Sequence, residues 1–422
     1  MMAGSARPIR IGIFVIQFPQ TTETFIVTKV LKLLDAGFDV QIFSVVESPH
    51  WDAFDVLKGR NDVRARVHVA PPIESLTRAL SVGALEVAKV VARHPRGFAS
   101  YVAHTFRTRH ETPTSFFRSL YHRLRFVEQR LDILHIEFDA QGIGITDLKE
   151  YLGCHVLYSA RGTFQRLSVN TWLPNAFEYI SRYADGYHFI SDFLDENTHR
   201  LGLPADIPTW HIEPAIDLTL FSPPPPRHRE RGAPLKLISV GRLSWAKGYE
   251  FALDAVARVR NAGIPVDYTI FGSGPYAEPI RFAVRQLKLG DCVRLAGSIK
   301  REDVPRAYAD ADIMVHAAIE EGFCNAVIEA QAMELPVVTS DSGGLRENVD
   351  DGVTGFVVPR RNPEAMTAQI LLLARDPGLR NTMGAAGRSR ALARFDLNAQ
   401  AAAFVQLYRE LAALPVRPVL RK

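Results

Sequence analysis

The sequence predicts an α/β fold with two doubly wound, Rossmann-like domains that face each other across a cleft. Three observations lead to this prediction. The chain has 422 residues, which is too long for one ordinary hydrophobic core. Apolar, strand-like runs alternate with helical patterns, as in parallel sheets. A proline-rich, charged stretch at 222–234 separates two such series and is typical of a loop or linker.

The first series begins with a continuous apolar run at 9–16, typical of a strand that is buried on both faces. A helical pattern at 22–37, which ends at a glycine, and a second strand at 40–45 complete a βαβ unit. Further strands of this series are expected at 132–138, 155–160 and 187–191.

The second series predicts a strand at 236–243 and a helix within 245–263. Strands are then expected at 266–274, 292–298, 312–318 and 336–344, with helices from about 363 onward. Ligands of such sheets bind outside the carboxyl ends of the strands, so the loops that follow these strands are where we look for a site.

Net charge, cysteine count and the length of apolar runs indicate the partners and the compartment of the protein. The net charge of +4 is small and does not indicate a nucleic-acid partner. Cys154, Cys292 and Cys324 have no metal-ligand spacing, and their odd number favours a reducing compartment. The apolar run near the start is too short for a signal peptide, and we find no run of about 18 apolar residues. We therefore expect a cytoplasmic chain.

Two cations follow the first strand of the second series. In VGRLSWAKG, Arg242 and Lys247 lie just past the strand and at the entry to a helix. An arginine fork and a lysine point charge in this position can hold a diphosphate. The alternative is a pair of solvated surface cations.

A glycine-rich turn follows the next strand. In IFGSGPYAEP, Gly272, Gly274 and Ala277 satisfy the dinucleotide fingerprint G-x-G-x-x-A. No acidic residue ends the strand after it, so we rank nicotinamide or flavin binding low and expect a turn that brings backbone close to a ligand. The pair Asp310 and Asp312 could hold a divalent cation, but carboxylates in a turn usually face water, and we expect no metal.

The stretch EEGFCNAVIEA places Glu321 before a turn and Glu329 one turn inside a helix. We expect Gly322 to permit the turn and Asn325 to cap a helix over 326–334. The N–H groups of Phe323, Cys324 and Asn325 would then point toward a phosphate, and Glu329 could accept two ribose hydroxyls. Carboxylates at a helix start are ordinary, but this pattern favours a nucleotide-sugar clamp.

The same half of the chain resembles glycosyltransferase family 4, which contains retaining enzymes of the GT-B fold. The motifs SVGRLSWAKG, IFGSGP, YADADIMVHAA, EEGFCNAVIEA and DGVTGFVVP occur in that family's order over residues 236–360. The resemblance implies that Glu321 contacts the donor sugar, that Glu329 binds the ribose, and that Arg242 and Lys247 hold the donor diphosphate. It implies no cofactor and no metal.

The N-terminal half is similar to bacterial exopolysaccharide transferases. FPQTTETFI (18–26) looks like their F-P-x-x-S-E-T-F-I, and DILHIEF (132–138) looks like their D-x-x-H-x-H-F. Here Glu137 replaces the second histidine, and Arg161-Gly162 stands where the family usually has His-Gly. We place Arg161 with the donor-binding residues, although arginine stays protonated and cannot act as a base.

From these features we expect an N-terminal acceptor-binding domain (1–210), a C-terminal nucleotide-sugar-binding domain (211–395) and a last helix that returns to the first domain (396–422). The predicted activity is retaining transfer of a sugar from a nucleoside diphosphate to a hydroxyl of a saccharide or a polyprenyl-diphosphate-linked saccharide, for surface polysaccharide synthesis. A nucleotide-sugar epimerase of the same fold and a non-catalytic saccharide- or nucleotide-binding relative remain alternatives.

A membrane surface is a further expected partner. Residues 94–130 hold seven arginines and two glutamates with interleaved aromatic residues. A basic helix with an aromatic face binds anionic bilayers; the alternative is that the aromatic residues pack on the sheet. The hypothesis is that this segment docks the chain on the inner face of the cytoplasmic membrane.

Overall fold

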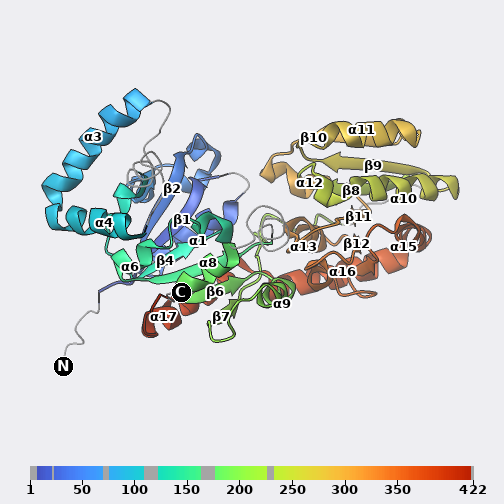
Figure 1. The fold of residues 1–422 in the computed structure, drawn as a ribbon. Helices are drawn as coiled ribbons and strands as arrows, with labels where there is room; N and C mark the ends of the chain where they lie inside the picture. The colour runs from blue at the N-terminus through green and yellow to red at the C-terminus, as the bar shows by residue number, and fades with distance from the viewer. Residues whose placement is uncertain are drawn as a thin grey trace. The chain divides into compact units, whose positions relative to one another are not determined.

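The computed structural model describes residues 7–20, 23–69, 76–108, 122–162, 176–225 and 232–419. The chain divides into two compact units (Figure 1). Unit 1 comprises Met1–Phe189, Asp195–Ile212 and Ala401–Lys422, and unit 2 comprises Ile190–Leu194 and Glu213–Gln400. Among the described residues, no helix has the length and apolar character needed to cross a bilayer.

Unit 1 is built on a seven-stranded sheet with the order β3-β2-β1-β4-β5-β6-β7. All neighbouring strands are parallel. The strand order reverses between β1 and β4, which is the topological switch point of a doubly wound sheet. The strands are β1 (Arg10–Phe18), β2 (Asp39–Glu47), β3 (Val67–Val69), β4 (Ile133–Ile136), β5 (His155–Ala160), β6 (Gly186–Phe189) and β7 (Thr209–His211).

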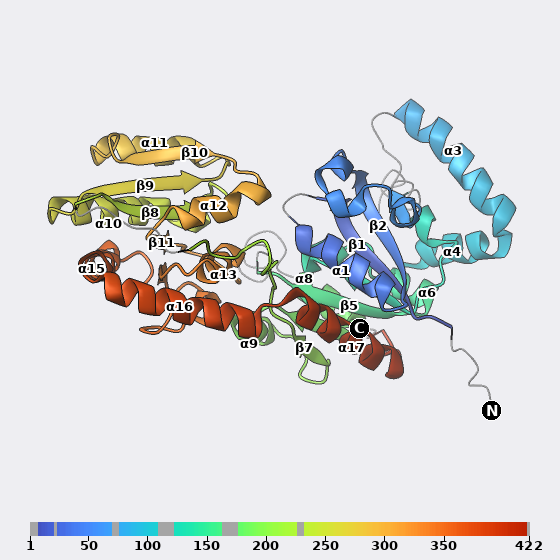
Figure 2. The ribbon, with the colours of Figure 1, turned by 180° about the vertical axis from the view of Figure 1, so that it is seen from behind.

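The helices of unit 1 come from both ends of the chain. They are α1 (Thr24–Asp35), α2 (Asn61–Arg64), α3 (Leu76–Arg93), α4 (Pro95–Thr108), α6 (Leu148–Leu152), α8 (Ala176–Tyr183), most of α9 (Asp192–Arg200) and the larger part of α17 (Leu397–Ala413). Helix α17 follows the long helix α16 (Pro377–Arg394) along the chain (Figure 2). Its buried face, which includes Phe404 and Leu407, packs into the same hydrophobic core as β1 and α1.

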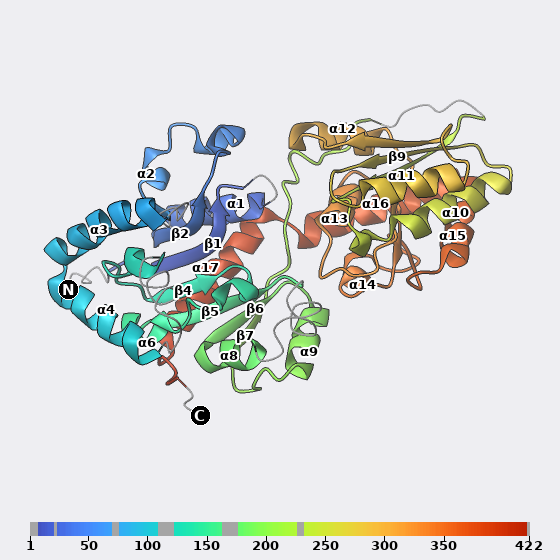
Figure 3. The same ribbon diagram turned by 45° about the horizontal axis from the view of Figure 1, so that its top comes forward.

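Unit 2 has a six-stranded parallel sheet with the order β10-β9-β8-β11-β12-β13, and its switch point lies between β8 and β11. The strands are β8 (Leu235–Val240), β9 (Val266–Phe271), β10 (Val293–Gly297), β11 (Ile313–His316), β12 (Val337–Ser340) and β13 (Gly355–Val358). The helices are α10 (Tyr249–Asn261), α11 (Ala277–Gln286), α12 (Val304–Ala309), α13 (Asn325–Ala332), α14 (Leu345–Asn348), α15 (Pro363–Arg375) and α16 (Figure 3).

Every strand that the sequence predicts is present, within a few residues of its expected bounds. Three further strands have no prediction: β3 and β7 have three residues each and β13 has four. A run of three or four residues shows too little periodicity to be recognised as a strand from the sequence.

The structure describes two parts of the segment 94–130: helix α4, which ends at Thr108, and the stretch from 122, which includes a 3-10 turn at Leu124–Phe126. Membrane binding by this segment stays a prediction, but two of its arginines are engaged inside unit 1. Arg123 is buried and pairs with Asp147, while Arg125 donates to backbone carbonyl oxygens, one of them that of His68 at 3.0 Å. These two guanidinium groups stabilise the interior of unit 1. Phe116, Phe117 and Tyr121 lie outside the described residues.

Candidate active site

The loops that follow β8 and β11 meet at the carboxyl edge of the sheet in unit 2. The first loop carries Lys247, and the second carries Glu321. Their side chains form an ion pair between Lys247 Nζ and Glu321 Oε2. The backbone supports this contact, because the carbonyl oxygen of Ala246 accepts the N–H of Ile319 at 2.8 Å and that of Glu320 at 3.2 Å. The switch point of unit 2 therefore joins a cation from one loop to a carboxylate from the other.

Charges around Glu321 are predominantly positive. Burial alone would raise the pKa of Glu321, but Lys247 and His316 together lower it to about 2. Burial alone would lower the pKa of His316, but Cys324 and Glu321 raise it to about 9. Lys247, whose pKa is also raised through Glu321, lies within electrostatic range of Arg242. At neutral pH, three cations thus surround one carboxylate, an arrangement that attracts an anion carrying more than one charge.

Arg242 differs from Lys247 in having an exposed side chain. Within the part of the chain that the structure describes, no hydrogen bond or ion pair holds its guanidinium group. Arginine presents five donors in a planar fork, which matches the oxygens of a phosphate. Arg242 is therefore available to a ligand, whereas Lys247 is held in place by Glu321.

The predicted glycines of the next loop act on Arg242 through the backbone. Gly272 has φ +148°, and a Cβ on it would lie 1.9 Å from the carbonyl oxygen of Gly241. Gly274 has φ +156°, and its Cβ would lie 2.3 Å from the carbonyl oxygen of Leu243. Both glycines are thus needed because the Arg242 loop packs directly on them. The sequence predicts that the backbone of this turn approaches a ligand. In the structure the backbone that lies close to both glycines is the loop that carries Arg242.

Glu329 occupies a different environment from Glu321. It lies one turn inside α13, where burial raises its pKa to about 7 against the opposing effects of Arg301 and of a hydrogen bond from Tyr308. The carbonyl oxygen of Ala326 lies 3.1 Å from the Tyr308 hydroxyl and is a second acceptor for its single proton. This carboxyl group changes its charge near neutral pH, which suits a group that binds hydroxyls when it is ionised.

Two details of the predicted phosphate contacts are wrong. The residue before α13 is Cys324, and Asn325 is the first helical residue and provides no side-chain cap. The N–H of Cys324 is already bonded to Oδ1 of Asn348 at 3.0 Å. Asn348 belongs to α14, so this tertiary contact could not be read from the local sequence. Phe323 is buried, and its ring packs edge-on against Phe395, while Gly322 is buried beside it.

His316 is a site residue that sequence analysis did not identify. It ends β11, and its Nε2 lies 3.4 Å from Glu321 Oε2. A histidine at the carboxyl end of a buried strand was the available signal. The ligand atoms of His316, Glu321 and Cys324 lie within 4.8 Å of one another. However, the ammonium group of Lys247 shares Glu321 and the raised pKa of His316 favours its protonated form, so these residues do not fit a metal ion well.

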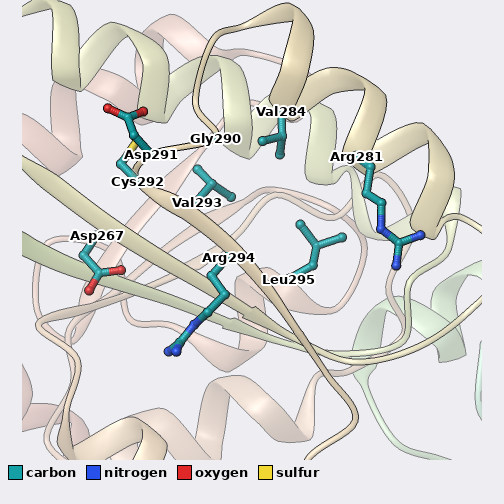
Figure 4. Close-up of a pocket in the computed structure, with 9 residues that line it drawn as sticks. All are labelled: Asp267, Arg281, Val284, Gly290, Asp291, Cys292, Val293, Arg294 and Leu295. Atoms are coloured by element: carbon teal, nitrogen blue, oxygen red, sulfur yellow. The ribbon is translucent and has the colours of Figure 1, made fainter.

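The other acidic pair is structural. Asp312 accepts the backbone N–H of Lys236 at 2.8 Å, and Asp310 pairs with the Lys236 ammonium group at 2.9 Å. A separate pocket of about 720 Å³ lies along β10 and α11 (Figure 4). None of the residues that line it belongs to the site around Glu321. We therefore place the candidate active site at the switch point, where the charges converge, and not in this pocket.

Arg161 lies in unit 1, at the end of β5, and is directly bonded to Glu137. Its Nη2 donates to Glu137 Oε2 at 2.9 Å, and its Nε donates to the Glu137 carbonyl oxygen at 3.0 Å. Lys29, from α1, forms a second ion pair with the same carboxylate. The two positions that depart from the family pattern are therefore one contact: an arginine–glutamate pair stands where two histidines are expected.

Comparison with known proteins connects this geometry to a function. Residues 225–390 match the model of a family described as glycosyl transferases group 1. Over these residues the chain is similar to that family. The matched residues include the loop of Arg242 and Lys247, the glycine turn and both glutamates of the switch-point site.

Two curated proteins are similar to this chain over nearly its whole length. WcaL of Escherichia coli (strain K12), named for colanic acid biosynthesis, is 24% identical over 389 residues, which is 86% of this chain and 90% of WcaL. The amylovoran biosynthesis glycosyltransferase AmsK of Erwinia amylovora is 24% identical over 388 residues, 87% of this chain and 91% of AmsK. The chain is thus similar, along most of its length, to proteins named for exopolysaccharide biosynthesis.

Solved structures show the same fold. HepE of Anabaena in complex with UDP has a TM-score of 0.69 at 18% identity, covering 95% of this chain and 100% of HepE. Sucrose-phosphate synthase of Thermosynechococcus elongatus has a TM-score of 0.71 at 20% identity, covering 96% and 99%. The chain therefore has the predicted GT-B fold.

Proposed function

We propose that the protein is a glycosyltransferase that moves a hexose from a nucleoside diphosphate to a hydroxyl of a saccharide or lipid-linked saccharide, with retention of configuration and without a metal. The observation that carries the proposal is the Lys247–Glu321 ion pair at the switch point of unit 2, with Arg242 free beside it. Exopolysaccharide enzymes among the relatives support this class of acceptor, and a structural relative was solved with UDP-glucose.

In this proposal the leaving diphosphate is stabilised by fixed positive charges. Lys247 and His316 are already held at Glu321 before the reaction, so they need little reorganisation as charge develops in the transition state. Arg242 joins them when it binds the diphosphate. Glu321 orients Lys247 and the donor sugar. Attack from the face that the diphosphate leaves requires no protein base, because a phosphate oxygen accepts the proton of the acceptor hydroxyl.

The diphosphate contact is tested with Arg242→Ala and Lys247→Ala. A thermal-shift screen first identifies the base among uridine, guanosine and adenosine diphosphates, since a bound ligand stabilises the folded state. Calorimetry then compares the nucleoside diphosphate with its nucleoside. We expect each variant to weaken binding of the nucleoside diphosphate by about 1.5–3 kcal/mol. The affinity for the nucleoside should stay unchanged. Arg375→Ala, an exposed arginine on α15, is the matched control. Equal losses for both ligands would contradict the proposal.

Turnover tests the role of Glu321. We expect Glu321→Gln to lower kcat with little change in donor KM. In the proposal Glu321 contacts the donor sugar next to the reacting carbon, so its loss affects the transition state more than donor binding. NMR of the first product formed should show the anomeric configuration of the donor, and a chelator should leave the rate unchanged. An inverted product, or activity restored only by an added divalent ion, would contradict the proposed mechanism.

A further inference from the structure

The Glu137–Arg161 pair in unit 1 has features of a binding group as well as a structural one. The Arg161 guanidinium lies 4.1 Å from the ring centre of Phe25 and 5.7 Å from that of Phe138. Together with the two bonds to Glu137, these rings hold the guanidinium group in one orientation. A cation held so firmly loses little conformational entropy when it binds a ligand.

One nitrogen of this guanidinium remains available. Glu137 occupies Nε and Nη2. No hydrogen bond joins Nη1 to a residue that the structure describes. The side chain as a whole is 13% exposed, and burial lowers the pKa of the guanidinium to about 10, so it keeps its charge at neutral pH. Among the described contacts, Nη1 is the nitrogen that Glu137 leaves for a ligand.

The position in the sheet also favours a ligand contact. Arg161 follows the last residue of β5, and Glu137 follows the last residue of β4. Both lie at the carboxyl edge of a parallel sheet, next to the switch point between β1 and β4, where ligands of such sheets bind. Lys29 contacts the same carboxylate, but burial and the charge of Arg161 lower the pKa of Lys29 well below its usual value, so Arg161 is the firmer positive charge at this edge.

We propose that Arg161 binds an anionic group, a carboxylate or a phosphate, that is carried by the acceptor. Glu137 is the positioning residue that orients the guanidinium. This inference rests on the proposed function, which assigns the donor to unit 2 and leaves unit 1 for the acceptor. It implies that the natural acceptor is acidic, either through a uronic acid or through a phosphate near the hydroxyl that is glycosylated.

The test uses the full chain and three small probes in ligand-observed NMR titrations. Methyl β-glucuronoside supplies a carboxylate, glucose 1-phosphate supplies a phosphate, and methyl β-glucoside is the neutral match. We expect at least one anionic probe to bind about tenfold or more tightly than the neutral one, as for a charge-assisted hydrogen bond. Which anionic probe binds distinguishes a uronic acid from a phosphate.

Variants locate the anion. Arg161→Gln keeps the Lys29–Glu137 pair. It should lower the affinity for the anionic probe to that for the neutral probe and leave the affinity for the nucleoside diphosphate unchanged. Arg161→Lys keeps the charge without the fork and should give an intermediate loss, and it serves if the glutamine variant does not fold. Lys247→Ala should do the reverse, weakening the nucleoside diphosphate and sparing the methyl glucuronoside.

Three results would overturn the inference. These are equal affinity of wild type for charged and neutral probes, an anionic preference that persists in Arg161→Gln, and a loss in Arg161→Gln that falls on the nucleoside diphosphate, which would make Arg161 a donor contact. If no nucleoside diphosphate binds at all but the anionic preference depends on Arg161, the proposed function fails and the anion site stands.

Discussion

The two glutamates of the switch-point site show how one sequence motif produces two different carboxyl groups. Glu321 faces Lys247 and His316, which lower its pKa to about 2. Glu329 is buried beside the hydroxyl of Tyr308, and burial raises its pKa to about 7. The first carboxylate is a permanent charge at neutral pH, while the second is poised to titrate. Spacing predicts that both approach the donor, but only tertiary contacts reveal this difference in charge.

Glu329→Gln should stabilise the protein at alkaline pH. The folded pKa of about 7 lies above the reference value of 4.5, so ionised Glu329 destabilises the folded state above pH 7 and has no effect below 4.5. The shift corresponds to at most about 3 kcal/mol. Thermal unfolding at pH 8 should therefore improve in the variant, with little gain at pH 4.5. Glu302→Gln, an exposed position, is the control, and an equal gain at both pH values would show that the pKa is not raised.

The same titration should appear in donor binding. An ionised Glu329 accepts hydroxyl protons better than a neutral one, so the donor KM should fall as pH rises from 6 to 8. In Glu329→Gln the KM should be higher and independent of pH over this range. Steady-state kinetics at a fixed acceptor concentration measure both effects, and an unchanged pH profile in the variant would assign the titration to another group.

At the scale of elements, the site is formed by loops that pack against one another. The turn after β9 packs on the loop after β8, and the loop after β11 bonds to the short 3-10 turn that carries Lys247. The motif glycines therefore act on the ligand indirectly, by fixing Arg242. The sequence predicts that Gly272 and Gly274 are required, but it does not show what approaches them, because the partner loop lies about thirty residues away.

Gly272→Ala should displace the Arg242 loop. A Cβ would lie 1.9 Å from the Gly241 carbonyl oxygen, so the backbone must move. Gly263→Ala is the matched control, since Gly263 also has a positive φ but nothing lies within 4 Å of its Cβ. We expect Gly272→Ala to cost at least about 2 kcal/mol more than the control and to weaken nucleoside diphosphate binding. Chemical denaturation and calorimetry measure the two effects, and equal costs for both variants would contradict the packing account.

At the scale of the whole molecule, the fold was largely predictable and the site only partly so. Long apolar runs with helices between them, such as β1 and α1, leave few alternatives to a parallel sheet. The contacts of Asn348 with Cys324, of Glu137 with Arg161 and of His316 with Glu321 join residues through the tertiary structure. Spacing along the chain carries no information about such contacts, so they were missed or assigned differently.

Leu407→Ala should unfold one unit before the other. Leu407 is fully buried in the core of unit 1, and its truncation should cost about 2–5 kcal/mol. Hydrogen exchange should show lost protection in β1 and β4 while β8 and β11 stay protected. Ile370→Ala, equally buried in unit 2, should give the opposite pattern. Uniform loss of protection in both variants would show that the units unfold as one.

The return of α17 to unit 1 constrains how the protein is made. Helix α17 is synthesised after unit 2, yet the core that contains β1 and α1 is incomplete without Phe404, Leu407 and Tyr408 of this helix. Synthesis of residues 213–400 intervenes, which takes roughly 10 to 40 s at about 5–20 residues per second. The apolar surface that these three side chains cover therefore stays exposed until α17 has been made. We expect the nascent chain to bind chaperones during this interval, and a premature stop codon after residue 400 would release a chain whose first unit cannot complete its core.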